Sequence, residues 1–475
     1  MESSPQLAKE VPFLKGLPLV GNLFNIESKY LHLKLHEWCD QYDGRFNYKV
    51  GPMIIHVFSD LDTIYDILKR RPHDFRRVVK IESVFKEIGT HGVFSVEGEA
   101  WRRQRRLIMP AFHQGHLKGF FGTLCTITGR LKSRLEAEAK AGSDFEISKD
   151  LMRFTVDVTT KLAFDYDMNT LEKGDDIIQK HLEHIFPSVG RRVTSIFPYW
   201  KFVKLPRDRA LDRALVGARR EITKIIEANR EASWQGIDPA PDGTTRKPKN
   251  MIQTLLTSRD ADGTGFTMDE ILGNVFTIMI AGEDTTATSL AWALTFMIEH
   301  PEVKERMKKE AHQVLGESEI PAQFEQLDGL KYIEAVILES MRLKPVAPCL
   351  FFEANHDLTL GGERFSKGTI VNAMISRPAR QEKYFSHANE FRPERWIEKE
   401  RDPSWKHEAK ALLPFGGGAR MCPGKTLAMV EMKCVLAMLC RNFEVQKPKN
   451  EIRWKEEFRF SAVPIDFWVR IETLQ

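Results

Sequence analysis

Several features that define other classes of protein are scarce in this 475-residue sequence. Its six cysteines are scattered, with no C-x-x-C pair and no zinc-type spacing, so the sequence indicates neither a disulfide framework nor a cysteine zinc site. This pattern favours a reducing compartment, and we expect the protein to be cytoplasmic. Internal repeats and low-complexity tracts are also missing, which argues against solenoid and fibrous architectures.

Long apolar runs are missing as well. The longest, around residues 271–281, is interrupted by polar residues and is well short of the roughly 20 residues that a spanning helix needs. Residues 1–15 carry charges and prolines and lack the apolar core of a signal peptide. We therefore expect no transmembrane anchor. A net charge of +4, without a basic-aromatic motif, also gives no reason to expect a nucleic-acid partner.

The remaining composition suits a globular protein, with 42% hydrophobic and 29% charged residues. Apolar spacing predicts helices over about 100–112, 117–139, 148–163, 207–231 and 251–258. Alternation predicts a hairpin of strands 45–50 and 53–58, and shorter strands at 358–360, 369–372 and 463–471. Polar, Pro/Gly-rich residues 232–249 indicate a mobile surface loop. We expect a mainly α fold with a minor antiparallel β part, forming a single domain over residues 1–475.

A glycine-rich, basic run around one cysteine is the most informative segment. It reads Phe415-Gly-Gly-Gly-Ala-Arg-Met-Cys-Pro-Gly424 and precedes a helical pattern over residues 425–440. A thiolate at Cys422 would lie at a helix N-terminus, where free N–H groups and the helix dipole favour negative charge. The glycines would let the backbone approach a flat ligand, and Arg420 would supply a cation for a carboxylate. The alternative is a buried, inert thiol, which we favour for the other five cysteines.

A second motif lies inside a long, mostly apolar helix. That helix is expected to begin at the capping box Thr267-Met-Asp-Glu270 and to end near residue 300, before a proline. Its centre reads Ala281-Gly-Glu-Asp-Thr-Thr286, where Gly282 and a back-bonded Thr285 would permit a kink or a widened turn. Asp284 and Thr285 form an acid–alcohol pair able to relay protons. The alternative is a polar patch that neighbouring helices satisfy.

Two further motifs place chemically matched side chains on one helix face. Glu339-Ser-Met-Arg342 sets a carboxylate and a guanidinium three residues apart, and Phe391-Arg-Pro-Glu-Arg-Trp396 follows downstream. Trp101 and Arg105, four residues apart, share a face of the 100–112 helix. Taken singly, the first pair also fits a modest surface ion pair, and the second fits a solvated basic helix.

Together and in this order, the four motifs resemble those of the cytochrome P450 family. The residues that fall on its haem-binding signature are Phe415, Gly416, Gly418, Arg420, Cys422 and Gly424. The resemblance covers nearly the whole chain and implies the cytochrome P450 fold, with haem between the long central helix and the cysteine loop and helix. Many eukaryotic relatives carry an N-terminal anchor, so the N-terminus here suggests a soluble, bacterial-type enzyme or a truncated chain.

The resemblance also implies roles for single residues. Cys422 would be the axial ligand of haem b, and Thr285 and Asp284 would be the catalytic pair that delivers protons for O–O cleavage. Glu339, Arg342 and Arg395 would form a buried structural triad. Other residues expected to bind the cofactor are Trp101, Arg105, Arg420, Phe415, Gly416, Gly418, Gly424 and Ala281.

One position departs from the family pattern. Phe352 stands where many relatives have an arginine or histidine that binds a haem propionate. That substitution leaves Trp101, Arg105 and Arg420 for the two propionates.

The implied function is a haem-thiolate monooxygenase that hydroxylates or epoxidises a lipophilic small molecule with O2. The substrate would be a fatty acid, terpenoid, steroid or polyketide. The pocket residues that the resemblance implies are Phe85, Ile88, Val346, Leu350, Phe460 and Val463. These side chains are apolar, as expected of a site for such a substrate.

Electrons would come from NAD(P)H through a separate ferredoxin or flavodoxin-type donor. A basic group would steer this acidic partner: Arg102, Arg103, Arg106, Lys425 and Lys433. Two other functions stay open. A peroxide-dependent or isomerising haem-thiolate enzyme commonly lacks the acid–alcohol pair, and a haem sensor or carrier gives no reason for an apolar pocket with a proton relay.

Overall fold

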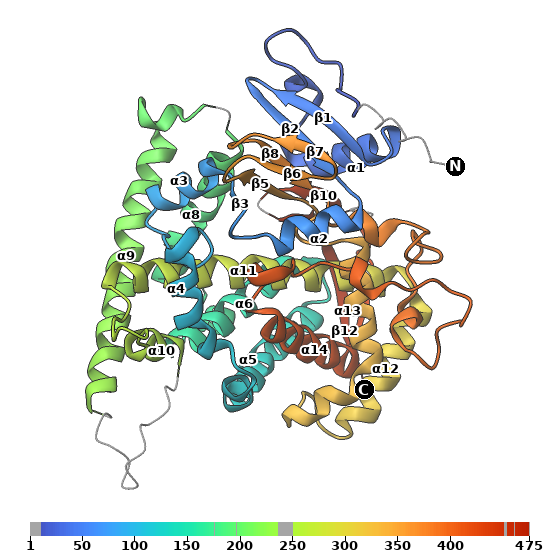
Figure 1. The fold of residues 1–475 in the computed structure, drawn as a ribbon. Helices are drawn as coiled ribbons and strands as arrows, with labels where there is room; N and C mark the ends of the chain where they lie inside the picture. Colours follow the sequence, from blue (N-terminus) through green and yellow to red (C-terminus); the bar gives the residue numbers. More distant parts are fainter. Residues whose placement is uncertain are drawn as a thin grey trace.

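Helices make up most of the computed structural model (Figure 1), which describes residues 11–174, 176–195, 197–235, 250–450, 454–459 and 461–474. The α-helices in these ranges are α1 (Leu31–Gln41), α2 (Leu61–Lys69), α3 (Val79–Glu87), α4 (Gly98–Ile108), α5 (Gln114–Ala141), α6 (Ile147–Phe164), α7 (Thr170–Lys173), α8 (Ile177–Thr194), α9 (Pro206–Gln235), α10 (Met251–Thr257), α11 (Met268–Glu299), α12 (Pro301–Leu315), α13 (Lys331–Leu343) and α14 (Lys425–Asn442). The predicted mainly α fold is confirmed.

The predicted helices correspond to α4, α5, α6, α9 and α10, with ends displaced by only a few residues. The largest displacements are at the ends of α4 and α9; at α4 the last predicted turn is a separate 3-10 helix, Met109–Phe112, that contains Pro110. The predicted surface loop at 232–249 begins inside α9, and residues 236–249 lie outside the described part of the chain.

The long central helix α11 organises the helical part of the molecule. It begins at Thr267, whose side chain accepts from the Glu270 N–H while the Glu270 carboxylate accepts from the Thr267 N–H, so the predicted capping box is present. Its residues belong to two hydrophobic clusters, one with α5, α6, α12, α13 and α14 and the other with α3, α4, α8, α9 and α10. In Figure 1 it crosses the centre of the molecule.

The strands form a smaller part: β1 (Arg45–Val50), β2 (Met53–Phe58), β3 (Phe75–Arg77), β4 (Phe145–Glu146), β5 (Leu350–Ala354), β6 (Leu358–Leu360), β7 (Glu363–Phe365), β8 (Ile370–Ala373), β9 (Phe443–Gln446), β10 (Lys455–Phe458), β11 (Ala462–Ile465) and β12 (Trp468–Thr473). Five of them make one sheet in the order β1-β2-β8-β5-β3, in which only β2 and β8 run parallel. The predicted 45–58 hairpin is confirmed residue by residue.

The prediction of one strand over 463–471 is wrong. Asp466 has a positive φ of 56°, and this left-handed residue divides the segment into β11 and β12. β11 pairs with β10, whereas β12 pairs with β4 and β9. The first of these strands, β11, contacts α11. Within the described residues, none of the helices is long and apolar enough to cross a membrane.

Candidate active site

The cysteine lies in a tight loop that only glycine could form. The Cys422 N–H donates to the Phe415 carbonyl at 3.0 Å, and Gly416 and Gly418 have φ values of 69° and 65°. A Cβ at Gly418 would lie 2.2 Å from the Leu68 carbonyl oxygen, so no side chain fits there. Cys422 is half-buried just before α14. The segment therefore has the form that the sequence predicted, a thiol presented at a helix start.

Burial raises the pKa of the Cys422 thiol. The N–H groups of Gly424 and Lys425 and the guanidinium of Arg105 favour the thiolate and oppose that rise. The Arg105 guanidinium is held in place by donating to the Met421 carbonyl at 2.7 Å. Arg105 thus contacts the cysteine loop, whereas its expected binding of a haem propionate stays a prediction.

The middle of α11 carries the predicted back-bonded alcohol. Thr285 Oγ1 donates to the Ala281 carbonyl at 2.7 Å. Ala281 is exposed and Thr285 is half-buried, although most of α11 around them is buried, so the described residues leave this side of the helix, here called its bare face, incompletely covered. The structure gives Gly282 a role that the sequence did not reveal. A Cβ there would lie 2.4 Å from Thr159 Oγ1 of α6, so the glycine allows the two helices to approach closely.

Asp284 faces the hairpin rather than Thr285. Its Oδ2 accepts a hydrogen bond from Ser461, at the turn between β10 and β11. Burial raises the pKa of the Asp284 carboxyl, and the Ser461 hydroxyl and Arg459 oppose that rise. Ser461 was not predicted, because nothing in the local sequence relates a serine to an acid 177 residues away.

A cluster of arginines lies next to the cysteine loop. The Arg420 side chain is only 4% exposed, and its guanidinium stands 4.3 Å from the centre of the Trp101 ring. Arg71 is 5% exposed and stacks on Phe352 at 4.6 Å. Both guanidiniums approach the carboxylate of Glu97. The fold thus brings Trp101 and Arg420 together, and their binding of the cofactor stays a prediction.

These buried cations are incompletely paired. Burial lowers the pKa of Arg71 to about 10 and that of Arg420 to about 9, while Glu97 opposes both shifts. Within the described structure, Nε and Nη2 of Arg71 and Nε and Nη1 of Arg420 have no hydrogen-bond partner. Buried donors without acceptors are costly. A group with more than one carboxylate, placed here, would remove that cost.

Arg71 was not predicted from the sequence. It stacks on Phe352, at the strand position where the family pattern led us to expect a cation. No local motif marks it, since it follows α2 and only the tertiary fold brings it to β5.

The predicted charged triad is present and fully buried. Glu339 accepts from Arg342 at 2.8 and 2.9 Å and from Arg395 at 3.0 Å, and all three side chains are 0% exposed. Trp396 Nε1 also donates to Glu339, at 2.8 Å. The two arginines also donate hydrogen bonds to main-chain carbonyls, which are those of Ala379, Ala388, Glu390, Ser386 and His387. The network therefore ties α13 to the segment that follows β8.

A second buried acid connects α14 to α11. Glu431 is 2% exposed, and burial raises the pKa of its carboxyl to about 8, a rise that its hydrogen bond with Thr286 opposes. Thr286 adjoins Thr285, so this bond joins the cysteine helix to the central motif. No sequence motif marks Glu431.

The predicted pocket residues fall into two groups. Phe85 and Ile88 are 1% and 3% exposed and belong to the cluster that contains Phe276 of α11. Val346, Leu350 and Val463 are half-buried, and the Ala462 N–H donates to the Val346 carbonyl at 2.8 Å, which joins the hairpin to the segment after α13. Phe460 lies outside the described residues.

The predicted basic group is only partly available at the surface. Lys433 is 9% exposed and bonded to Glu334 and the Leu327 carbonyl, so its inclusion was wrong. Arg103 is half-buried against Glu270, and Arg106 is paired with Asp260. Arg102 and Lys425 are exposed. The last turn of α4 and the start of α14 are therefore less strongly positive than the sequence suggested.

Comparison with known proteins identifies the arrangement. A family model described as cytochrome P450 matches residues 11–466. The chain belongs to the cytochrome P450 family. It is therefore an enzyme of the haem-thiolate monooxygenase type, an oxidoreductase whose cofactor is haem.

Its relatives are distant. It is 26% identical over 431 residues to the chloroplastic protein LUTEIN DEFICIENT 5 of Arabidopsis thaliana, covering 90% of this chain and 71% of that protein. It is 28% identical over 466 residues to the putative cytochrome P450 CYP13A3 of Caenorhabditis elegans, covering 91% and 87%. A self-sufficient monooxygenase of Penicillium freii, CYP505E4, is 28% identical over 460 residues, which are 94% of this chain but 42% of that enzyme.

Proposed function

We propose that this chain binds haem b between α11 and the cysteine loop, and that the Cys422 thiolate would be the protein ligand of its iron. The observation that carries this is the group of buried, incompletely paired guanidiniums beside a cysteine at a helix start. Haem has two propionate carboxylates, and Arg71, Arg420 and Arg105, with Trp101, would hold them. The glycines at 416, 418 and 424 would keep the loop thin against the flat ring. Bound haem would supply the iron at which dioxygen is activated.

Two residues of α11 would bind water and transfer protons. Thr285 donates its hydroxyl hydrogen to Ala281, so its oxygen remains able to accept from a water on the bare face of the helix. Asp284, whose pKa is raised by burial, would carry a proton at the neighbouring position. We infer that Asp284 collects protons on the Ser461 side and passes them toward the water that Thr285 holds.

We propose a lipophilic small molecule as substrate, a fatty acid, terpenoid, steroid or polyketide, oxidised by hydroxylation or epoxidation. Support comes from half-buried apolar side chains: Val463 lies on β11, which contacts α11, and Val346 is joined to β11 through the Ala462 N–H. NAD(P)H would supply electrons through a separate ferredoxin or flavodoxin-type protein in the cytoplasm. The matched segment is only 42% of the self-sufficient Penicillium freii monooxygenase. For this chain we propose a separate protein as the electron donor.

The test is the spectrum of the Cys422→Ser variant. The reduced, CO-bound wild type should show the red-shifted absorption band typical of thiolate-ligated haem, and the variant should lose it. Cys125→Ser is the matched control, because Cys125 is also a half-buried thiol but lies on α5. Persistence of the band in Cys422→Ser would refute the assignment, whereas its loss in both variants would indicate a general folding defect.

A further inference from the structure

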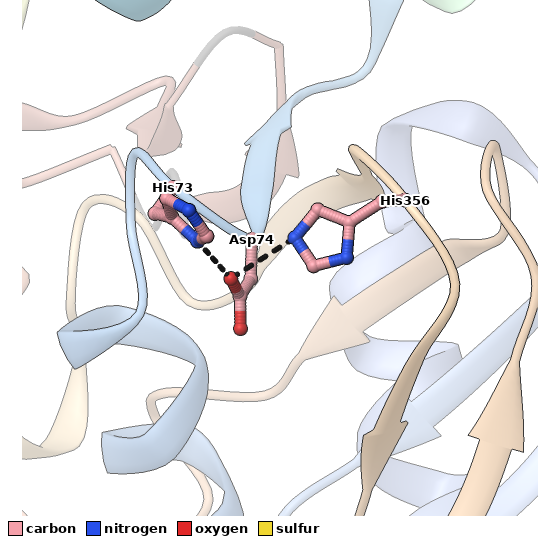
Figure 2. A group of neighbouring side chains, drawn as sticks. All are labelled: His73, Asp74 and His356. Carbon is pink, nitrogen blue, oxygen red and sulfur yellow. Dashed lines mark hydrogen bonds and ion pairs between the residues drawn. The ribbon is translucent and has the colours of Figure 1, made fainter.

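Three side chains of types that often bind metal ions lie close together at the surface, outside the cysteine loop. His73 and Asp74 lie between α2 and β3, and His356 lies between β5 and β6. Figure 2 shows the two imidazole rings on either side of the carboxylate. His356 Nε2 is 3.2 Å from Asp74 Oδ1, and His73 Nδ1 contacts the same oxygen. All three ligand atoms lie within 4.8 Å of one another.

Neighbouring groups orient these ligands. His356 Nδ1 is 3.0 Å from the Asp357 carbonyl, which can only accept, so Nδ1 carries a hydrogen and Nε2 is the nitrogen that would bind an ion beside Asp74. Arg70 Nε donates to Asp74 Oδ2 at 2.5 Å, so Oδ1 is the carboxylate oxygen that faces the two histidines. The charge of Arg70 is further offset by Asp66, 2.9 Å away. A histidine held through its second nitrogen is the usual arrangement around protein-bound metal ions.

The two loops are held together by hydrogen bonds that Asn355 donates to main-chain carbonyls. Asn355 Nδ2 donates to the carbonyls of Pro72 and His73 at 3.1 and 2.8 Å. The Asn355 N–H donates to the Asp74 carbonyl at 2.8 Å. The ligands therefore start from fixed backbone positions, which reduces the ordering cost of binding an ion.

We propose that His73, Asp74 and His356 bind one divalent ion of the zinc class. Two imidazoles and a carboxylate suit this ion, and tetrahedral bonds of about 2.0–2.2 Å separate ligand atoms by about 3.3 Å. The spacing from His356 to Asp74 already matches, and His73, whose side chain is 75% exposed, is free to move outward. Solvent would complete the coordination. The ion would join the two loops beside Arg71, the residue next to Pro72.

The test uses the haem-loaded full chain, freed of metal with a chelator that is then removed. Calorimetric titration with zinc chloride should show one site, and zinc should raise the melting temperature because it binds the folded state. His73→Ala and His356→Ala should each weaken binding at least tenfold and remove most of the thermal shift. Both side chains are exposed, so these variants should fold normally.

Two controls make the result specific. His312→Ala, at an exposed histidine on α12, should bind zinc as the wild type does. Magnesium, which prefers oxygen ligands, should not bind. The proposal fails if the wild type does not bind zinc stoichiometrically, if binding survives both histidine substitutions, or if magnesium binds equally well. The thiolate spectrum of Cys422 is measured separately, so this outcome is independent of the proposed monooxygenase function.

Discussion

At the scale of single residues, the site depends on charges that the fold buries. Phe352 occupies a position where the family pattern led us to expect a propionate-binding cation, and the structure places Arg71 directly over that ring. A guanidinium buried beside another and sharing one carboxylate with it is unfavourable unless a further anion is present. We therefore expect Arg71 to compensate for Phe352 in holding the cofactor.

Arg71→Met should speed the loss of haem from the protein. A charge-assisted hydrogen bond is worth about 1.5–3 kcal/mol, so haem affinity should fall roughly 10- to 100-fold. The measurement is the rate of haem transfer to an excess of apomyoglobin. Arg102→Met is the control, because Arg102 is exposed and paired only with Glu99 in a surface contact. Equal transfer rates for the two variants would show that Arg71 does not hold haem.

At the scale of elements, α11 is positioned by its contacts with α6 on one side and α14 on the other. Gly282 permits close approach to Thr159, and Thr286 bonds to Glu431. Both contacts adjoin the central motif, so the geometry of the site depends on helix packing as much as on the motif itself.

Gly282→Ala should destabilise the protein by about 1–3 kcal/mol, because the new methyl group overlaps Thr159 Oγ1. Removing that hydroxyl in the double variant Gly282→Ala/Thr159→Ala should restore part of the loss. Urea denaturation of the two single variants and the double variant measures this coupling. Gly129→Ala on α5, where a Cβ meets nothing within 4 Å, should have little effect or stabilise slightly. Strict additivity would argue against the packing explanation.

Glu431 should make stability depend on pH. Its pKa is about 8 in the folded protein against an ordinary 4.5, so the folded state retains a proton that the unfolded chain releases. Ionisation of Glu431 therefore does not change the free energy of unfolding below about pH 4.5. Between about pH 4.5 and pH 8 it lowers that free energy as pH rises, by at most about 1.4 kcal/mol per pH unit.

Glu431→Gln cannot ionise and should lack this loss. Subtracting the free energy of unfolding of the variant from that of the wild type, between pH 5 and pH 9, isolates the contribution of this one group. A difference that stays constant over this range would mean that Glu431 is not buried as a neutral acid.

At the scale of the whole molecule, the network around Glu339 connects a core helix to the long irregular segment before the cysteine loop. Glu339 belongs to α13, whereas Arg395 and the carbonyls bound by the two arginines belong to residues 379–395. Its burial indicates a structural role. That residues 1–475 form one domain stays a prediction.

Glu339→Gln should leave Arg342 and Arg395 buried without a countercharge, at a cost of about 3–5 kcal/mol. The variant should be poorly folded and low in haem, as judged by circular dichroism and by the ratio of haem to protein absorbance. Glu302→Gln at the start of the neighbouring helix α12 is the control, because the Glu302 side chain is 73% exposed and its loss buries no unpaired charge. A folded, haem-replete Glu339→Gln protein with slowed turnover alone would instead assign Glu339 a catalytic role.

The sequence by itself determined the features that depend on neighbouring residues. It predicted the α11 capping box, the β1–β2 hairpin and the back-bond of Thr285, because each is set by contacts within about four residues or across a tight turn. It also placed Cys422 before a helix. These signals sufficed to indicate the family.

The tertiary structure alone decided which distant residues complete the site. Ser461 reaches Asp284, Arg71 reaches Phe352 and Glu431 reaches Thr286 across separations that no local pattern encodes. It also showed that Lys433 is buried, since a charged residue on a helix face has no fixed exposure until its neighbours pack. Local chemistry fixes elements and caps, whereas burial and pairing follow from how those elements pack together.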